Sequence, residues 1–215
     1  MLKEMLQWGN MSAGPGHMDI DGRSAEKLLL TEYEIPKDRL ILANPLPEGL
    51  YNLHAVWATG EDKDSRIAPV LQESITFGLN LRVHWTTVTK KAYVLKATGA
   101  ANKLLAPTAV TNGSRMFSAY FKGKLGLINE PLDELAKALE GAFEVPVVNE
   151  TGIDGKFDVE LEFPAKDLQA AKGILLKTLG LELIEAERPI QMLEVSSRQE
   201  AKKAEEGKPQ PTLKP

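Results

Sequence analysis

Apolar residues recur along the chain with two spacings, and each spacing predicts one kind of element. Every second position is apolar in residues 50–58 and 156–163, which is typical of strands with one buried face. Apolar positions three and four apart occur in residues 67–75 and 168–179, which is typical of helices packed on one side. Gly180 marks the end of the second of these helices. The pattern therefore predicts a chain that mixes helices and strands at short intervals.

The predicted elements form two successive series of similar order. The first series is a strand at 18–20, a helix at 24–33, strands at 40–42 and 50–58, a helix at 67–75, and a hairpin of strands at 79–87 and 92–97. The second is extended chain at 115–121 and 124–128, a helix from Pro131, strands at 147–148 and 156–163, a helix at 168–179, and a hairpin of 181–184 and 190–195 turned at Arg188-Pro189. We read each half as β-α-β-β-α-β-β. The expected class is α+β, with each half a ferredoxin-like, split βαβ sandwich carrying its helices on one sheet face.

The two halves also match position by position, which suggests an internal duplication. Ile41 and Val147 lie 106 positions apart, as do Gly49 and Gly155, and each glycine precedes an aromatic-bearing strand. The helix-Gly-strand units at Gly78 and at Gly180 match with an offset of 102. The simpler alternative is that any two such units look alike, but the agreement over five ordered elements favours duplication. The predicted organisation is a flexible lead-in at 1–16, a first repeat at 17–97, a linker at 98–114, a second repeat at 115–196 and a disordered tail at 197–215.

The apolar faces of these elements predict the core. We expect one set of strand and helix residues to be buried, and the tryptophans Trp8, Trp57 and Trp85 to lie in or near the core. The set is Leu53, Trp57, Leu71, Leu81, Leu135, Val159, Leu161, Leu175 and Leu183.

The composition of the chain argues against several classes of function. The 215 residues carry a formal net charge of −4, which argues against nucleic-acid binding and against adsorption to an anionic membrane surface. There are no cysteines, which excludes disulfides, thiolate catalysis and cysteine-ligated zinc. No apolar run approaches the roughly 20 residues of a membrane span. Glu4 interrupts the apolar start, so we expect no signal peptide in this chain.

Candidate chemistry is sparse. The chain lacks a nucleophile elbow, a phosphate-binding glycine loop and a zinc-protease motif. We therefore assign no catalytic residue, metal ligand or cofactor, and we read His54 and His84 as surface histidines on strands. An acidic stripe opposite the apolar face of residues 156–163 is either a solvated surface, a docking face for a basic partner or, more weakly, a carboxylate pair. The candidate binding residues are Asp154, Asp158, Glu160, Glu162, Arg82 and His84.

Several segments resemble a known family. These are Tyr33-Glu34-Ile35-Pro36, the stretch from Val147 to Asp158 containing Thr151-Gly152-Ile153-Asp154-Gly155-Lys156-Phe157-Asp158, Leu179-Gly180-Leu181, and the stretch from Pro189 to Val195. Together they resemble the bacterial "soil-associated protein" family of unknown function, over about residues 18–196. The departures are conservative, with Ile153, Lys156 and Phe157 replacing Leu, Arg and Tyr, but the usual N-terminal Ile-Lys-Pro strand is not visible. The resemblance implies an exported protein, sometimes found beside thioredoxin-like domains or sensor peptidases, and it supplies no catalytic residues.

Two hypotheses follow. The first is a non-enzymatic module of the bacterial cell envelope that binds a protein or peptide, located in the periplasm or outside the cytoplasm. The second is a hydrolase-type enzyme with a carboxylate and histidine site between the halves. A cytoplasmic location is the alternative if export does not apply. An unpaired sheet edge favours the first hypothesis, and a histidine within about 3 Å of a carboxylate in a deep cleft favours the second.

Overall fold

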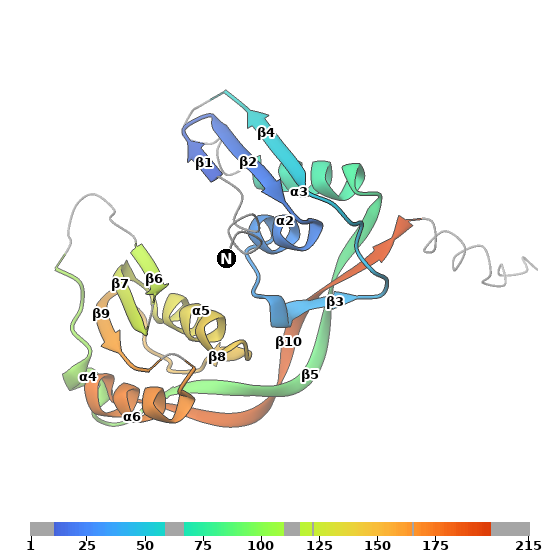
Figure 1. The fold of residues 1–215 in the computed structure, drawn as a ribbon. Helices are drawn as coiled ribbons and strands as arrows, with labels where there is room; N and C mark the ends of the chain where they lie inside the picture. Colours follow the sequence, from blue (N-terminus) through green and yellow to red (C-terminus); the bar gives the residue numbers. More distant parts are fainter. Residues whose placement is uncertain (1–10, 59–66, 110–116, 122, 165, 199–215) are drawn as a thin grey trace, which may run out of the picture. The chain divides into compact units, whose positions relative to one another are not determined.

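The computed structural model describes residues 11–58, 67–109, 117–121, 123–164 and 166–198. Its elements, in chain order, are β1 (Met11–Gly14), β2 (His17–Arg23), α2 (Ala25–Glu32), the 3-10 turn η1 (Lys37–Arg39), β3 (Leu40–Leu42), β4 (Tyr51–Val56), α3 (Ile67–Gly78), β5 (Leu81–Ala97), α4 (Ala101–Leu104), β6 (Phe117–Phe121), β7 (Lys124–Glu130), α5 (Leu132–Phe143), β8 (Val147–Asn149), β9 (Phe157–Glu162), α6 (Leu168–Leu179) and β10 (Leu181–Ser197) (Figure 1). The α+β class is confirmed. β1 lies in the stretch predicted as a lead-in, and Trp8 and most of the predicted tail lie outside the described residues.

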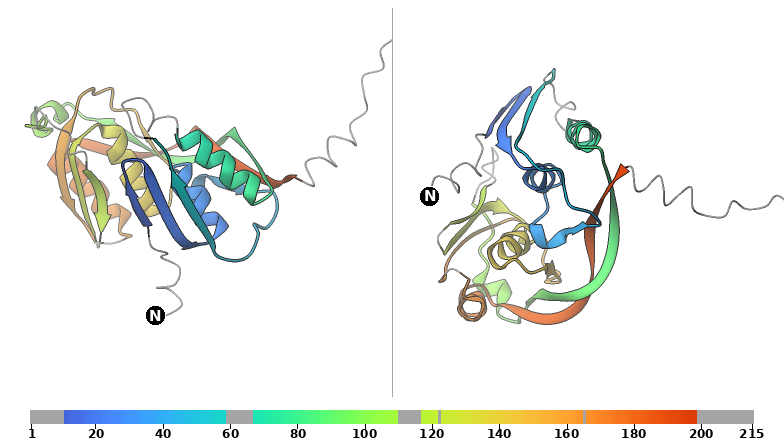
Figure 2. Two further views of the ribbon diagram at one scale, coloured as in Figure 1. Left: turned by 90° about the horizontal axis from the view of Figure 1, so that it is seen from above. Right: turned by 45° about the vertical axis from the view of Figure 1, so that its right-hand side comes forward.

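The strands form three sheets. Two are antiparallel and three-stranded, in the orders β1-β2-β4 and β6-β7-β9, and the third has four strands in the order β3-β10-β5-β8. Figures 1 and 2 show β5 and β10 running side by side as long strands. The short strands β3 and β8 pair in parallel with β10 and with β5, respectively. The expected ferredoxin-like sandwich is therefore wrong, because each half divides its strands between its own antiparallel sheet and the four-stranded one.

The two predicted hairpins are also wrong, since β5 and β10 are each one continuous strand of 17 residues. Residues 86–89 of β5 are Thr-Thr-Val-Thr, which favours extended chain, and no glycine or asparagine follows to make a tight turn. In β10 the residue before Pro189 is itself restricted to extended conformations. β3 pairs only with residues 193–195 of β10, so the missing amide of Pro189 leaves no β3 hydrogen bond unmade.

The order of elements in the first half of the chain recurs in the second half. The number of positions that separates the matching helix–strand junctions differs from the number predicted. Asn80 and Gly180 each have positive φ, 54° and 66°, and each immediately precedes a 17-residue strand. These junctions match with an offset of 100 rather than 102. The same bulge recurs as well: the Gly22 amide donates to Asn52 Oδ1, and the Asn129 amide to Asp158 Oδ1. Superposition of residues 18–97 on 115–196, and the domain bounds drawn from it, stay predictions.

By its contacts the chain divides into two compact units. Unit 1 comprises the described residues up to Thr86 together with those from Gln191 onward, and unit 2 runs from Thr87 to Ile190. In unit 1, α2 begins at Ser24, whose Oγ accepts a hydrogen bond from the Lys27 amide at 3.4 Å. The core beneath α2 and α3 contains Ile20, Leu28, Leu29, Ile75, Leu79, Leu81, Leu193 and Val195.

Unit 2 has the larger core. Its buried cluster joins α5, α6, β7, β9 and β10 and includes Leu125, Leu127, Leu135, Leu139, Phe157, Val159, Leu161, Leu175 and Leu183. Seven of the nine residues predicted to be buried are buried. Leu53 and Trp57 are only half-buried, and Trp85 is 49% exposed, so these three expectations are wrong.

The turn before β9 depends on glycine, as expected. Gly152 has φ +66° and Gly155 has φ +120°, a region where a Cβ is costly. Asp154 is not the residue whose hydrogen bonds hold this turn. Asn149 Oδ1 accepts from the Thr151 amide at 3.0 Å and from its hydroxyl at 2.8 Å, and Thr151 Oγ1 accepts from the Ile153 amide at 3.3 Å.

Candidate functional site

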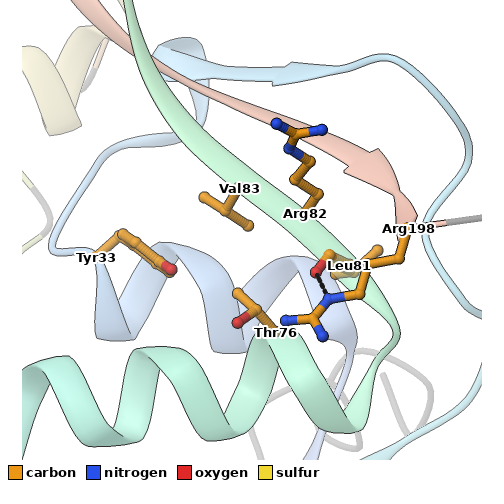
Figure 3. Close-up of a pocket in the computed structure, with 6 residues that line it drawn as sticks. All are labelled: Tyr33, Thr76, Leu81, Arg82, Val83 and Arg198. Atoms are coloured by element: carbon orange, nitrogen blue, oxygen red, sulfur yellow. Dashed lines mark hydrogen bonds between the residues drawn. The ribbon is translucent and has the colours of Figure 1, made fainter. Parts of the chain in front are cut away.

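A pocket of about 400 Å³ opens in unit 1 between α2, α3 and the start of β5 (Figure 3). The residues that line it are Tyr33, Thr76, Leu81, Arg82, Val83 and Arg198. Two are cationic, two offer hydroxyl groups and two are aliphatic, while none is acidic. This combination suits a ligand that joins an apolar part to an anionic group.

Both arginines are lining residues of the pocket, but in Figure 3 their guanidinium groups lie on opposite sides of β5. Arg82 is on β5 next to Leu81, and Arg198 follows β10 directly. The Arg198 amide donates to the Asn80 carbonyl at 3.0 Å, and its Nε donates to the Leu81 carbonyl at 2.8 Å. The second bond, drawn in Figure 3, holds the Arg198 guanidinium beside the first residue of β5. Arg198 is thus held at the pocket by residues more than a hundred positions earlier in the chain.

Two aromatic side chains, those of Trp85 and Phe77, contact residues that line the pocket. The Tyr33 and Trp85 rings meet edge to face, with centroids 6.3 Å apart. The Arg198 guanidinium carbon lies 5.4 Å from the centroid of Phe77, within the range of a cation–π contact. Phe77 is 72% exposed and Trp85 is 49% exposed. Exposed aromatic rings beside arginine are the composition that protein-binding sites favour.

The tyrosine and arginine side chains of the pocket are hydrogen-bond donors. Burial raises the pKa of Tyr33 above its ordinary value, so its phenol stays protonated at neutral pH. The Thr76 hydroxyl donates to the Glu73 carbonyl at 2.9 Å, inside its own helix, and so offers the pocket only an acceptor. The pocket therefore favours an acceptor such as a carboxylate.

The six residues proposed from the sequence fall into separate groups. Arg82 lines the pocket, and the neighbouring His84 lies 3.4 Å from a Glu194 carboxylate oxygen. Asp154, Asp158, Glu160 and Glu162 all belong to unit 2, where all four are exposed. Lys124 Nζ lies 3.5 Å from Glu162. The structure does not join the acidic stripe and Arg82 in one site.

Asp158 has a structural role in unit 2. Its carboxylate accepts a hydrogen bond from the Asn129 amide at 2.8 Å, where β7 bulges before α5. That bond, with others from the Thr108 side chain and the Ala109 amide, lowers the pKa of Asp158. The acidic stripe thus begins with a residue that stabilises a bulge.

Sequence reasoning missed a histidine–aspartate cluster on β2 and β4. His54 Nδ1 lies 2.9 Å from Asp19 Oδ1, and His54 Nε2 lies 3.3 Å from Asp21 Oδ1. Only the strand register, which places His54 opposite Asp19, reveals the cluster. Ser12 of β1 lies opposite Asp19 on the other side, so the aspartate separates the hydroxyl from the imidazole. A catalytic triad needs the histidine in the middle, and this order does not supply one.

The histidine–aspartate cluster predicts a raised pKa for His54. The Asp19 hydrogen bond is the largest cause that raises the pKa of His54 above its ordinary 6.5. Desolvation comes next and lowers this pKa, and the charges of Asp21 and then Asp19 raise it. Because the folded-state pKa is raised, the ion pair stabilises the fold fully below pH 6.5, and this contribution is lost as pH rises through the folded-state pKa. An NMR titration of the His54 ring should show the raised pKa, and Asp19→Asn should lower it. Asp154→Asn in unit 2 is the control, and an equal change there would contradict the assignment.

Neither a metal centre nor a membrane span is found in the part of the chain that the structure describes. No three His, Cys, Asp or Glu side chains there are grouped to hold a metal ion. No helix in the same ranges has the length and apolar character to cross a membrane.

Comparison with known proteins gives a family but no function. Neither the curated proteins nor the solved structures contain a significant match to this chain. One family model matches residues 26–197, which is most of the sequence, and its description is "Protein of unknown function (DUF3738)". The chain belongs to the DUF3738 family of proteins of unknown function.

Proposed function

We propose that this chain is a non-enzymatic module that binds an acidic peptide or protein segment at the pocket that Tyr33, Arg82 and Arg198 help to line. One observation carries the proposal: the Arg198 guanidinium, 5.4 Å from the exposed ring of Phe77, lies at a pocket whose lining includes no acid among the described residues. Trp, Tyr and Arg are the residues that dominate the energetics of protein interfaces. A location in the cell envelope is the part of the proposal that rests on the family resemblance alone.

The chemistry of the pocket defines the ligand. A guanidinium binds a carboxylate through two parallel hydrogen bonds, more strongly than a neutral donor does. The half-buried Val83 side chain offers apolar surface at the pocket, whereas Leu81 is only 3% exposed. The ligand that fits is therefore a glutamate- or aspartate-rich segment with one aromatic or aliphatic residue.

The hydrolase hypothesis lacks a comparable site. His54 and His84 each have a carboxylate neighbour, but both side chains are more than half exposed. Neither lines the pocket, and Ser12 is separated from His54 by a strand. The geometry supports binding better than acid–base catalysis.

The test uses a labelled peptide, acetyl-Glu-Glu-Phe-Glu-Glu-amide, and fluorescence polarisation at low salt. We expect measurable binding, a loss of roughly 3- to 10-fold in affinity for Arg82→Gln and for Arg198→Gln, and a loss of about 10-fold or more for Trp85→Ala.

The matched control is Lys91→Gln, which removes one exposed positive charge from unit 2, where Lys91 lies 3.5 Å from Glu185. This variant should bind the peptide as the parent does. Equal weakening by all the charge-removing variants indicates nonspecific attraction and overturns the proposal, as does absence of binding to the parent protein.

A further inference from the structure

A second site emerges when the two units are compared at their strand–helix grooves. In unit 1 an open groove of about 170 Å³ lies between β4 and α3. Its apolar lining comes from Leu28, Tyr51, Leu53, Ile75 and Leu79. This volume is below the usual range for small-molecule sites, and it suits a single aliphatic side chain.

The corresponding groove of unit 2 lies between β9 and α6. Gly49 and Gly155 have nearly the same φ, +119° and +120°, and a Cβ on either would face the ring two residues later, Tyr51 or Phe157. On the helix side, Leu79 and Leu179 each precede the positive-φ residue at the start of a long strand. The two grooves are therefore built from matching positions.

In unit 2 the chain itself occupies the groove. Leu105 is 6% exposed and belongs to the same buried cluster as Phe157, Val159 and Leu179. Two residues later Pro107 forms an antiparallel bridge with Phe157, and the Thr108 amide donates to the Lys156 carbonyl at 2.9 Å. The segment from Leu105 to Thr108 thus adds extended chain to the start of β9 and buries one leucine beside it.

In unit 1 the matching groove is uncovered among the described residues. Within the described part of the chain, β4 is the last strand of its sheet and pairs with β2 alone. Tyr51 and Leu53 are only half-buried, whereas their counterparts Phe157 and Val159 are 5% and 4% exposed. The difference in burial is what a missing segment along β4 produces.

We infer that the groove between β4 and α3 binds an extended segment of a partner protein, which adds to the edge of β4 and places one aliphatic side chain in the groove. The segment that fills the unit 2 groove defines the partner's chemistry: an aliphatic residue followed, two positions later, by the residue that bridges the strand. Residues 199–215, which follow β10 in the sequence, do not offer an aliphatic side chain at the matching position. The offset of 100 that relates Asn80 to Gly180 relates Leu105 to Glu205, and a carboxylate is costly in an apolar pocket.

The probe is a synthetic peptide with the sequence of residues 103–110, Lys-Leu-Leu-Ala-Pro-Thr-Ala-Val. Titrated into the full chain, it should shift the NMR amide signals of residues 51–56 and 74–79. A peptide with alanine in place of Leu105 should bind about 10-fold more weakly, because it buries less apolar surface. Ser74→Trp, at an exposed position of the groove lining, should abolish the shifts, and Thr178→Trp on α6 should not.

Several outcomes overturn the inference. Shifts confined to β9 show that the peptide only competes with the chain's own segment. Binding that appears only after deletion of residues 199–215 makes those residues the occupant, and sedimentation showing a dimer that Ser74→Trp dissociates makes a second copy the occupant. Ser74→Trp should leave the acidic-peptide affinity of the arginine pocket unchanged, so the two sites can fail separately.

Discussion

Replacing Leu161 by alanine should lower the free energy of unfolding by about 2–5 kcal/mol, because the change removes transfer free energy and leaves a cavity. Leu161 is 2% exposed, in the middle of β9, and lies opposite Leu125, which is fully buried. Both belong to the largest buried cluster of unit 2. Chemical denaturation followed by circular dichroism measures the loss.

The matched control is Glu160→Ala, at the preceding position of the same strand, where the side chain is exposed. Its effect should stay within about 0.5 kcal/mol, as for most surface substitutions. A loss well under 1 kcal/mol for Leu161→Ala would mean that the site collapses around the smaller side chain or that β9 does not form the core described here.

The sequence predicted the short elements well because their signals are local. Ser24 starts α2 and Gly180 ends α6, and in each case the capping residue acts on the adjacent turn. The alternation in residues 156–163 placed β9 on the core correctly, since a strand's period of two assigns its faces directly. These features needed no knowledge of the rest of the fold.

The long strands failed for a different reason. A break in apolar alternation near Lys90 and near Arg188 looked like a turn, but both strands continue through these positions. Residues 87–89 of β5 are exposed in succession, whereas in β10 the exposed residues Glu185, Glu187, Pro189 and Gln191 lie on one face of the strand. A solvated strand and a loop have similar composition, and only the pairing of β5 with β10 distinguishes them. The same misreading placed Trp85 in the core, although it is 49% exposed.

The candidate site was only partly predictable. Arg82 was selected as a basic counterpart of the acidic stripe, whereas Tyr33 and Arg198 carry no sequence signal that relates them to it. The bond from Arg198 Nε to the Leu81 carbonyl spans 117 positions, and such a contact follows from the order of strands in the sheet. The covered groove of unit 2 was equally hidden, because residues 98–114 look like a linker until Leu105 is seen to be buried.

Replacing Gly180 by alanine should destabilise the fold by at least about 2 kcal/mol, since two costs coincide there. Gly180 has φ +66°, a conformation that costs a residue with a Cβ roughly 1–2 kcal/mol. The new Cβ would also lie 2.7 Å from the Ala101 nitrogen and 2.9 Å from the Ala100 carbonyl carbon. These are backbone atoms of a segment that Thr98 ties to Gly180, through hydrogen bonds to its carbonyl from the amide at 2.9 Å and the hydroxyl at 2.7 Å.

Gly152→Ala separates the two costs, because Gly152 has the same φ of +66° and a Cβ there meets no atom within 4 Å. Gly152→Ala should lower the free energy of unfolding by about 1 kcal/mol, because it adds backbone strain without a steric clash. Thermal and chemical denaturation of both variants measure the difference, which is the cost of moving the chain at Ala100 and Ala101 away from α6. Equal losses in the two variants would contradict close packing of that segment on Gly180. A larger loss at Gly180 would support it, and with it the covered groove of unit 2, because the same segment continues to Leu105 and the edge of β9.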